Sequence, residues 1–162
     1  MNLIHGASSL LIGYFFGCFQ TSYFISKLII KKDIRDMGSG NAGASNVTSE
    51  LGWKYGIITG VSDVLKAFIP THLVVLIFPN IDHEINMMVL AGTGAVLGHI
   101  YPFFLDFRGG KGVACYIGML LAINWQIGVA VIIGLILITI ITDYVSVGSI
   151  SLYIIIPILA YI

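Results

Sequence analysis

Residues 38–47, which read GSGNAGASNV, combine residue types that are suited to holding an anion. Glycine lets successive backbone N–H groups converge on one point, and the serine and asparagine side chains add neutral hydrogen-bond donors. If residues 45–53 form a helix, the N-terminus of that helix adds positive potential at the same place. The segment therefore predicts a phosphate-binding loop, with a flexible loop as the alternative.

The same segment matches the pattern G-x-G-x-x-G through Gly38, Gly40 and Gly43, and Asp63 follows at the distance expected of a ribose-binding acid. A dinucleotide-binding fold places these glycines between a strand and a helix. Here they follow an apolar stretch of membrane-spanning length, and Asp63 lies within the next such stretch. We therefore exclude a dinucleotide site.

Residues 98–114, GHIYPFFLDFRGGKGVA, form a second candidate site, in which Arg108 and Lys111 flank Gly109 and Gly110. Small residues let the backbone approach an anion, while lysine supplies a point charge. A nucleotide P-loop would need serine or threonine after the lysine, and glycine stands there instead. Anchoring of the chain by basic residues at the membrane surface is the alternative, but the paired glycines and the nearby histidine and proline favour a site.

Three further side chains could take part in chemistry. His99, in the second segment, is a candidate base or oxyanion partner, with a purely structural histidine as the alternative. Asp63 and Lys66 lie within one apolar stretch, where each charge alone would cost about 2.5–3.5 kcal/mol at mid-bilayer. Their i, i+3 spacing puts them on one helix face, so we expect an intramembrane ion pair that is either functional or structural.

The composition shows which elements must position these residues. The chain has 162 residues, of which 57% are hydrophobic and 10% charged, and its eight basic residues balance its eight acidic ones. Soluble domains carry about 25% charged residues. These figures exclude an ordinary cytosolic domain, a disordered chain and a basic nucleic-acid binder. They predict an all-α, polytopic integral membrane helical bundle.

The apolar stretches predict about six membrane spans, since one crossing needs about 20 residues. They cover residues 3–26, 55–78 (broken by Pro70), 85–105, two short spans within 112–141 separated by a turn at 124–126, and 147–162. The loops 27–54 and 106–111 hold every lysine and arginine except Lys66, so we expect both loops on the cytoplasmic side. A third polar segment, YVSVGSI at 144–150, falls on the same side in this topology.

In these features the chain resembles the bacterial glycerol-3-phosphate acyltransferases that use acyl phosphate, the PlsY family. GSGNAGASNV resembles the first motif of that family, GHIYPFFLDFRGGKGVA the second and DYVSVGSI the third, and Asp63 to Lys66 matches its acid-x-x-lysine. The four matches occur in order along nearly the whole chain. The family resemblance implies seven transmembrane helices and an enzyme of phospholipid synthesis in the bacterial inner membrane, with its active site facing the cytoplasm.

The resemblance also implies a reaction and roles for residues. An acyl chain passes from acyl phosphate to the 1-hydroxyl of glycerol 3-phosphate, giving lysophosphatidate and phosphate, with no metal, no cofactor and no nucleic acid. The carried-over catalytic residues are Ser39, His99 and Lys111, and the substrate-binding residues are Gly38, Gly40, Asn41, Asn46, Arg108, Gly109, Gly110 and Ser149. We expect that no covalent acyl-enzyme forms and that the acceptor's own phosphate, or His99, takes the proton.

Three departures from the family pattern qualify this expectation. Ser49 stands where the first motif usually has arginine, and Asp143 stands where a basic residue usually precedes the third. The chain ends at Ile162, before the family's seventh helix and its basic motif, so we expect residues 1–162 to be a single but C-terminally incomplete transmembrane acyltransferase domain. A partner chain could then supply the missing helix.

Two other functions remain as alternatives. One is a catalytically inactive or truncated relative that binds phosphate or a partner chain, which the lost basic groups favour and the retained Ser39, Asn41 and Lys111 oppose. The other is a small anion transporter, which two paired repeats would support. The sequence shows no such repeats.

Overall fold

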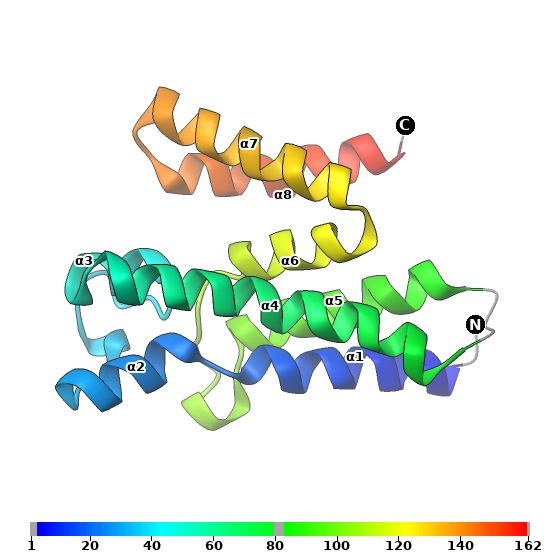
Figure 1. The fold of residues 1–162 in the computed structure, drawn as a ribbon, viewed down its shortest axis with the longest axis horizontal. Helices are drawn as coiled ribbons and strands as arrows, with labels where there is room; N and C mark the ends of the chain where they lie inside the picture. The colour runs from blue at the N-terminus through cyan, green and yellow to red at the C-terminus, as the bar shows by residue number, and fades with distance from the viewer. Residues whose placement is uncertain (1–2, 80–82, 162) are drawn as a thin grey trace.

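The computed structural model describes residues 3–79 and 83–161, without the side chains of residues 152 and 155–161, and every regular element within those ranges is helical (Figure 1). The elements, in chain order, are α1 (Leu3–Cys18), α2 (Thr21–Ile30), the 3-10 helix η1 (Ile34–Asp36), α3 (Ala44–Leu51), α4 (Trp53–Ile77), α5 (Glu84–Ile100), the 3-10 helix η2 (Phe103–Leu105), α6 (Val113–Ile123), α7 (Trp125–Thr142) and α8 (Val145–Tyr161). The predicted all-α membrane bundle is confirmed.

Each predicted apolar stretch contains a helix, although the lengths differ from a simple set of crossings. Among the residues that the structure describes, four candidate spans are long and apolar enough to cross a membrane: 3–30, 53–77, 84–105 and 125–142. Helix α6 has 11 residues, which is about 17 Å of helix against a hydrocarbon core of about 30 Å. The predicted break at Pro70 is wrong, because α4 continues through this buried proline.

The predicted turn at 124–126 is a single residue. Asn124 ends α6 and begins α7, and its side-chain oxygen accepts hydrogen bonds from the backbone N–H groups of Gln126 and Ile127 at 3.0 and 3.1 Å. An asparagine in this position satisfies backbone donors that the first turn of a helix leaves unpaired. The chain therefore reverses within one residue, which leaves α6 and α7 packed against each other.

Helices α1 and α5 pack with their backbones in direct contact. A Cβ at Gly13 or Gly17 would overlap the carbonyl groups of α5, and a Cβ at Gly94 or Gly98 would overlap those of α1. The glycines follow each other at four-residue spacing on both helices, as in the small-xxx-small pattern of membrane helix pairs. This packing fixes the position of α5, whose last turn carries His99.

The first span is interrupted, and α4 and α5 supply partners for the polar groups at the break. The carbonyl of Phe19 accepts a hydrogen bond from Lys66 Nζ at 2.7 Å, and Gln20 Nε2 donates to the carbonyl of His99 at 2.9 Å. Both Gln20 and Lys66 are buried. In lipid an unpaired backbone group costs several kcal/mol, so a break in a span persists only where other helices satisfy it.

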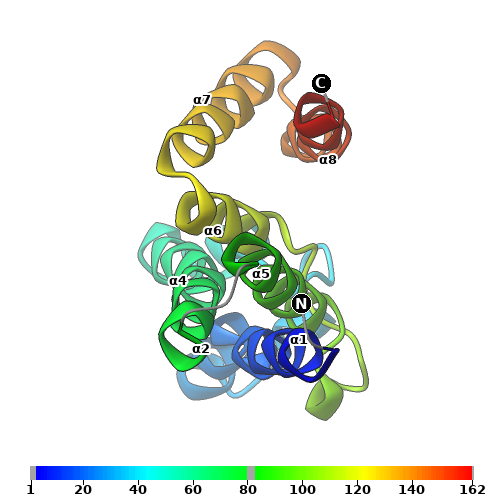
Figure 2. The ribbon, with the colours of Figure 1, turned by 90° about the vertical axis from the view of Figure 1, so that its right-hand side faces the viewer.

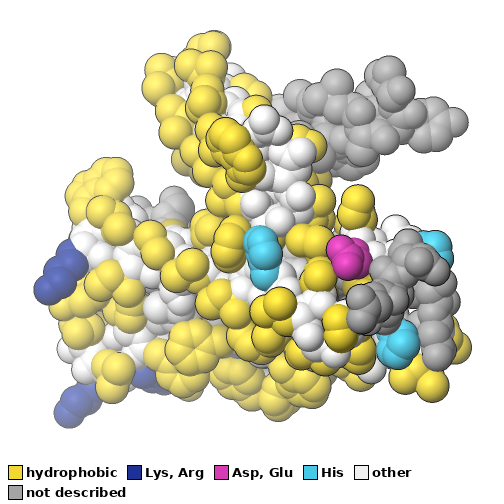
Figure 3. Space-filling model, turned by 45° about the vertical axis from the view of Figure 1, so that its right-hand side comes forward, with side chains coloured by type: hydrophobic (Ala, Val, Ile, Leu, Met, Phe, Trp, Pro, Cys, Tyr) yellow, Lys and Arg dark blue, Asp and Glu magenta, His cyan; other side chains and the backbone are white. Residues whose placement is uncertain are grey.

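The outer surface is apolar along the helices. Leu28, Leu76 and Ile141 are 79%, 77% and 80% exposed, as expected of side chains that face lipid. In the space-filling view, lysine and arginine gather at one end of the visible face (Figure 3). Helices α7 and α8 lie to one side of the α1–α5 bundle, with α6 between (Figure 2).

We predict that Gly17→Leu lowers the thermal unfolding midpoint of the protein in detergent by about 5 °C or more, because overpacking a tight interface costs about 1–3 kcal/mol. Gly134→Leu is the matched control, since nothing lies within 4 Å of a Cβ at Gly134 on α7. Equal midpoints for the two variants would contradict the close packing of α1 and α5.

Candidate functional site

A cavity of about 290 Å³ opens where the three polar segments of the chain meet. Its lining includes Asn41 and Ser45 from the first segment, Lys111 and Gly112 from the second, and Ser149 from the third. These segments are far apart in sequence, but the connections before α3, α6 and α8 lie in the same half of the bundle (left in Figure 1). The three segments therefore meet at one cavity, while their position on the cytoplasmic side stays a prediction.

Three helices begin at this cavity. Helix α3 starts after Gly43, α6 starts after Gly112 and α8 starts at Val145, and all three of these residues line the cavity. No side chain caps α3 or α6. The first N–H groups of a helix have no partner within it, and the helix dipole makes that end positive. Converging helix starts beside Lys111 suit the cavity to an anion such as phosphate.

The glycine-rich segment is held in shape by Asn46, which is buried. Its Oδ1 accepts a hydrogen bond from Ser39 N at 2.9 Å, while its Nδ2 donates to the carbonyls of Ile34 and Met37 at 3.1 and 3.0 Å. Gly38 has φ of +52°, a backbone conformation that glycine adopts at little cost. The predicted loop is thus an ordered structure built around one side chain.

The predicted residues of this segment are not equivalent in the structure. Asn41 lines the cavity, whereas Ser39 is exposed and, like Gly38 and Gly40, is not among the residues described as lining it. Asn46 lies behind the segment, with its side chain donating to and accepting from the backbone. Ser39 and the two glycines therefore belong to the loop that is shaped around Asn46, and the structure does not bring them to the described cavity.

The second segment folds back onto the end of α5. Gly109 N donates to the carbonyl of Ile100 at 2.9 Å, and Gly110 N donates to the carbonyl of His99 at 3.0 Å. A Cβ at Gly110 would overlap the His99 ring, so only glycine fits there. The turn directs Lys111, which is exposed, to the cavity. Arg108 is exposed and does not line the described cavity.

Asp63, Lys66 and His99 form a buried charged group between α4 and α5. Lys66 Nζ lies 2.8 Å from Asp63 Oδ1, so the predicted ion pair is present. His99 Nδ1 lies 3.5 Å from the same Asp63 oxygen. Asp63 and His99 both line the cavity. Removing one partner of a buried ion pair typically destabilises a protein by about 3–5 kcal/mol. The Asp63–Lys66 pair therefore stabilises the part of the cavity wall to which His99 belongs.

The third segment contributes the start of α8. Ser149 is 8% exposed, lines the cavity and donates its hydroxyl to the carbonyl of Val145 at 2.8 Å. Tyr153 Oη, one turn further on, donates to the carbonyl of Lys111 at 3.2 Å. This bond links α8 to the second segment. Ser146 also lines the cavity; the sequence placed it in a polar segment but gave no reason to single it out.

Gln20 is a buried polar residue that sequence reasoning missed. Its side chain is fully buried and donates to the carbonyl of His99, and its Oε1 has no hydrogen-bond partner. The available signal was a glutamine inside an otherwise apolar span. Within the described ranges, no three His, Cys, Asp or Glu side chains gather closely enough to hold a metal ion.

Comparison with known proteins gives consistent results. A family model described as glycerol-3-phosphate acyltransferase matches residues 7–162. Glycerol-3-phosphate acyltransferase 1 of Oceanobacillus iheyensis is 42% identical over 149 residues, which cover 89% of this chain and 71% of that protein. The glycerol-3-phosphate acyltransferase of Thermosipho melanesiensis is 43% identical over 141 residues, which cover 87% of this chain and 67% of that protein.

Two crystal structures of PlsY (YgiH), an integral membrane glycerol 3-phosphate acyltransferase, share the fold. The glycerol 3-phosphate form superposes with a TM-score of 0.80 at 36% identity, over 90% of this chain and 71% of that one. The lysophosphatidic acid form superposes with a TM-score of 0.78 at 35% identity, over 90% and 70% of the two chains.

We predict that Asn46→Ala speeds hydrogen exchange of the Ser39 amide about fivefold or more, because it leaves that amide without its acceptor and removes the donor of two carbonyls. Exchange is followed by mass spectrometry on peptides covering residues 37–43. Asn124→Ala is the matched control, since it also removes an asparagine that accepts from backbone amides, but at the start of α7. Unchanged exchange at 37–43 in Asn46→Ala would refute the role assigned to Asn46.

Proposed function

Because the chain belongs to the glycerol-3-phosphate acyltransferase family, the family of the PlsY structures, we propose that it transfers an acyl group from acyl phosphate to the 1-hydroxyl of glycerol 3-phosphate. The hydroxyl oxygen attacks the acyl carbon and forms an ester bond. The bond between that carbon and the phosphate oxygen breaks, and phosphate leaves with the electron pair. The products are lysophosphatidate and inorganic phosphate, and the hydroxyl proton goes to a phosphate oxygen or to His99.

The observation that carries this proposal is the cavity at the starts of α3, α6 and α8. Both substrates carry a phosphate group, and the cavity supplies Lys111, Asn41 and the starts of three helices, whose dipoles make those ends positive. A site that holds two anions side by side brings the hydroxyl close to the acyl carbon, which is a large part of the catalysis that such a reaction needs. The same donors stabilise the negative charge that develops on the oxygens.

The cavity also has an apolar side, which suits an acyl donor. Val113, Ile117 and Leu135 line it together with the polar groups. Acyl phosphate is already activated, so the site needs to supply no nucleophile, and we propose that no covalent acyl-enzyme forms. In this proposal the backbone of Gly38, Ser39 and Gly40 shapes the loop beside the cavity. Arg108 adds a positive charge near its opening.

His99 is the side chain that we propose interacts directly with the reacting hydroxyl or carbonyl group. His99 is 3% exposed, and its ring lies between Asp63 and Gly110 at the cavity wall. A histidine there can accept the hydroxyl proton or donate a hydrogen bond to the carbonyl oxygen. Gly109, Gly110 and Ser149 complete the proposed substrate-binding set with Asn46 as their structural support.

The chain is a multi-pass membrane protein of a bacterial family, and we propose that it resides in the inner membrane with this cavity facing the cytoplasm. The basic residues support this orientation, because lysine and arginine remain on the cytoplasmic side. They gather at the end of the molecule that carries α2 and α3 (Figure 3). We further propose that residues 1–162 form part of one transmembrane acyltransferase domain.

The direct test is an activity assay on purified chain in detergent or on membranes that carry it. We predict lysophosphatidate from glycerol 3-phosphate with acyl phosphate as the donor and none with acyl-CoA. Lys111→Ala is expected to lower kcat/KM about tenfold to a hundredfold, because a charged hydrogen bond contributes about 1.5–3 kcal/mol. The matched control is Lys32→Ala, an exposed lysine of the loop that precedes the glycine-rich segment.

The outcomes separate the two candidate functions. Product from acyl-CoA alone would refute the proposed donor while retaining acyl transfer. Absence of product with either donor, together with phosphate binding that Lys111→Ala abolishes, would favour an inactive relative that binds phosphate. An equal loss of activity in Lys32→Ala would show that the lysine acts through overall charge and would contradict its assigned place in the site.

A further inference from the structure

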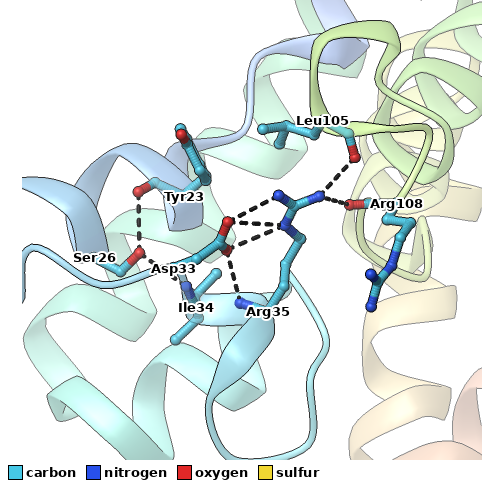
Figure 4. Close-up of polar contacts among 7 residues, drawn as sticks. All are labelled: Tyr23, Ser26, Asp33, Ile34, Arg35, Leu105 and Arg108. Carbon is cyan, nitrogen blue, oxygen red and sulfur yellow. Dashed lines mark hydrogen bonds and ion pairs between the residues drawn. The ribbon is translucent and has the colours of Figure 1, made fainter.

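Arg35 lies in η1, between the first span and the glycine-rich segment, and its guanidinium is held by Asp33. Arg35 Nη2 donates to Asp33 Oδ2 at 2.8 Å, and Nε donates to both carboxylate oxygens at 3.1 and 3.2 Å (Figure 4). The backbone N–H of Arg35 also donates to Asp33 Oδ1 at 2.9 Å. The two side chains are only 14% and 11% exposed. This is a fixed pair, unlike an exposed ion pair on a mobile surface.

The other edge of the guanidinium reaches a loop about seventy residues further along the chain. Arg35 Nη1 donates to the carbonyl of Leu105 at 2.6 Å and to the carbonyl of Arg108 at 3.3 Å (Figure 4). These two residues flank a tight turn in which Asp106 and Phe107 both have positive φ. Lys111 follows three residues after Arg108. One planar side chain therefore joins the segment before the first motif to the turn before Lys111.

The base of this link is fixed to α2. Ile34 N donates to Ser26 Oγ at 3.2 Å, and Ser26 Oγ donates to the carbonyl of Tyr23 at 3.0 Å (Figure 4). The guanidinium carbon of Arg35 lies 5.9 Å from the centre of the Tyr23 ring, within range of a cation–π contact. The hydrogen bonds from Arg35 lower the pKa of the Asp33 carboxyl, with Lys27 nearby adding to the effect, so Asp33 stays ionised at neutral pH.

The link continues from η1 into the glycine-rich segment. Asn46 donates to the carbonyls of Ile34 and Met37, on either side of Arg35, and accepts from Ser39 N. A shift of η1 would therefore move residues 38–41 as well. Arg35 itself is not among the residues described as lining the cavity, and each of its guanidinium nitrogens already donates to a protein oxygen. Its donors are engaged in joining two loops, which leaves Arg35 without the free fork that a phosphate ligand needs.

We propose that Arg35, oriented by Asp33, is a positioning residue that sets the glycine-rich segment and the Lys111 turn opposite each other across the cavity. The role in catalysis rests on the proposed function, but the mechanical link between the two loops does not. Arginine is suited to this task because its rigid planar fork can bind a carboxylate on one side and carbonyls on the other, which lysine cannot do.

Hydrogen exchange tests the link without reference to activity. In Arg35→Ala we expect amides of residues 105–110, whose own segment is unaltered, to exchange about tenfold faster, together with those of residues 36–40. Arg35→Lys should give nearly the same result, because it keeps the charge but loses the fork. Lys32→Ala removes a charge from the same loop and should leave both peptides unchanged. Wild-type exchange at 105–110 in Arg35→Ala and Arg35→Lys would overturn the proposal.

Steady-state kinetics test the consequence for catalysis. A displaced Lys111 turn raises the KM for glycerol 3-phosphate, by about tenfold in Arg35→Lys, whereas a loss of folded protein alone lowers the apparent kcat and leaves KM unchanged. An unchanged KM in folded Arg35→Lys would overturn the positioning role. If the wild-type chain itself forms no lysophosphatidate, the proposed function fails, and the exchange experiment still decides whether Arg35 links the two loops.

Discussion

The meeting of three helix starts at one cavity is the arrangement on which the rest of the structure depends. Among the described cavity-lining residues, only Lys111 supplies a full positive charge, so binding of an anion there would depend on partial charges as well. Helices α3, α6 and α8 can add partial charges only if all of them begin at the same end of the bundle. Helix α7 runs back along α6 and brings the start of α8 to the half of the molecule where α3 and α6 begin (Figure 1).

Polar groups inside the bundle are tied to that same end. The Lys66–Asp63 pair and the Gln20 side chain connect the break after α1 to the last turn of α5, where His99 lies. Burying such groups is costly unless they find partners, and Lys66 Nζ and Gln20 Nε2 each find a backbone carbonyl at the break or in α5. The close glycine contacts of α1 and α5 bring these groups within reach, so the packing of the spans and the chemistry of the cavity depend on each other.

The sequence predicted local features well and long-range ones poorly. Hydropathy located the apolar helices, and glycine, serine and asparagine at 38–47 marked a loop beside the cavity, because both signals come from residues that are neighbours in sequence. The continuity of α4 through Pro70 was missed, since tertiary packing decides whether a proline ends a helix. From the sequence, Arg35 was only one of several positive charges in the predicted cytoplasmic loop. Its carbonyl partners lie about seventy residues further along the chain, so no local pattern indicates the contact. Likewise Ser39 was expected at the site, and only the structure shows its backbone bonded to Asn46 and its side chain exposed.

A double-mutant cycle on glycerol 3-phosphate binding tests most directly whether the first and second segments hold one ligand. The dissociation constant is measured for the wild type, Asn41→Ala, Lys111→Ala and the double variant. If both residues contact the same bound molecule, the two losses are coupled by about 0.5–3 kcal/mol. Losses that add to within about 0.5 kcal/mol would contradict a shared cavity and leave two independent segments.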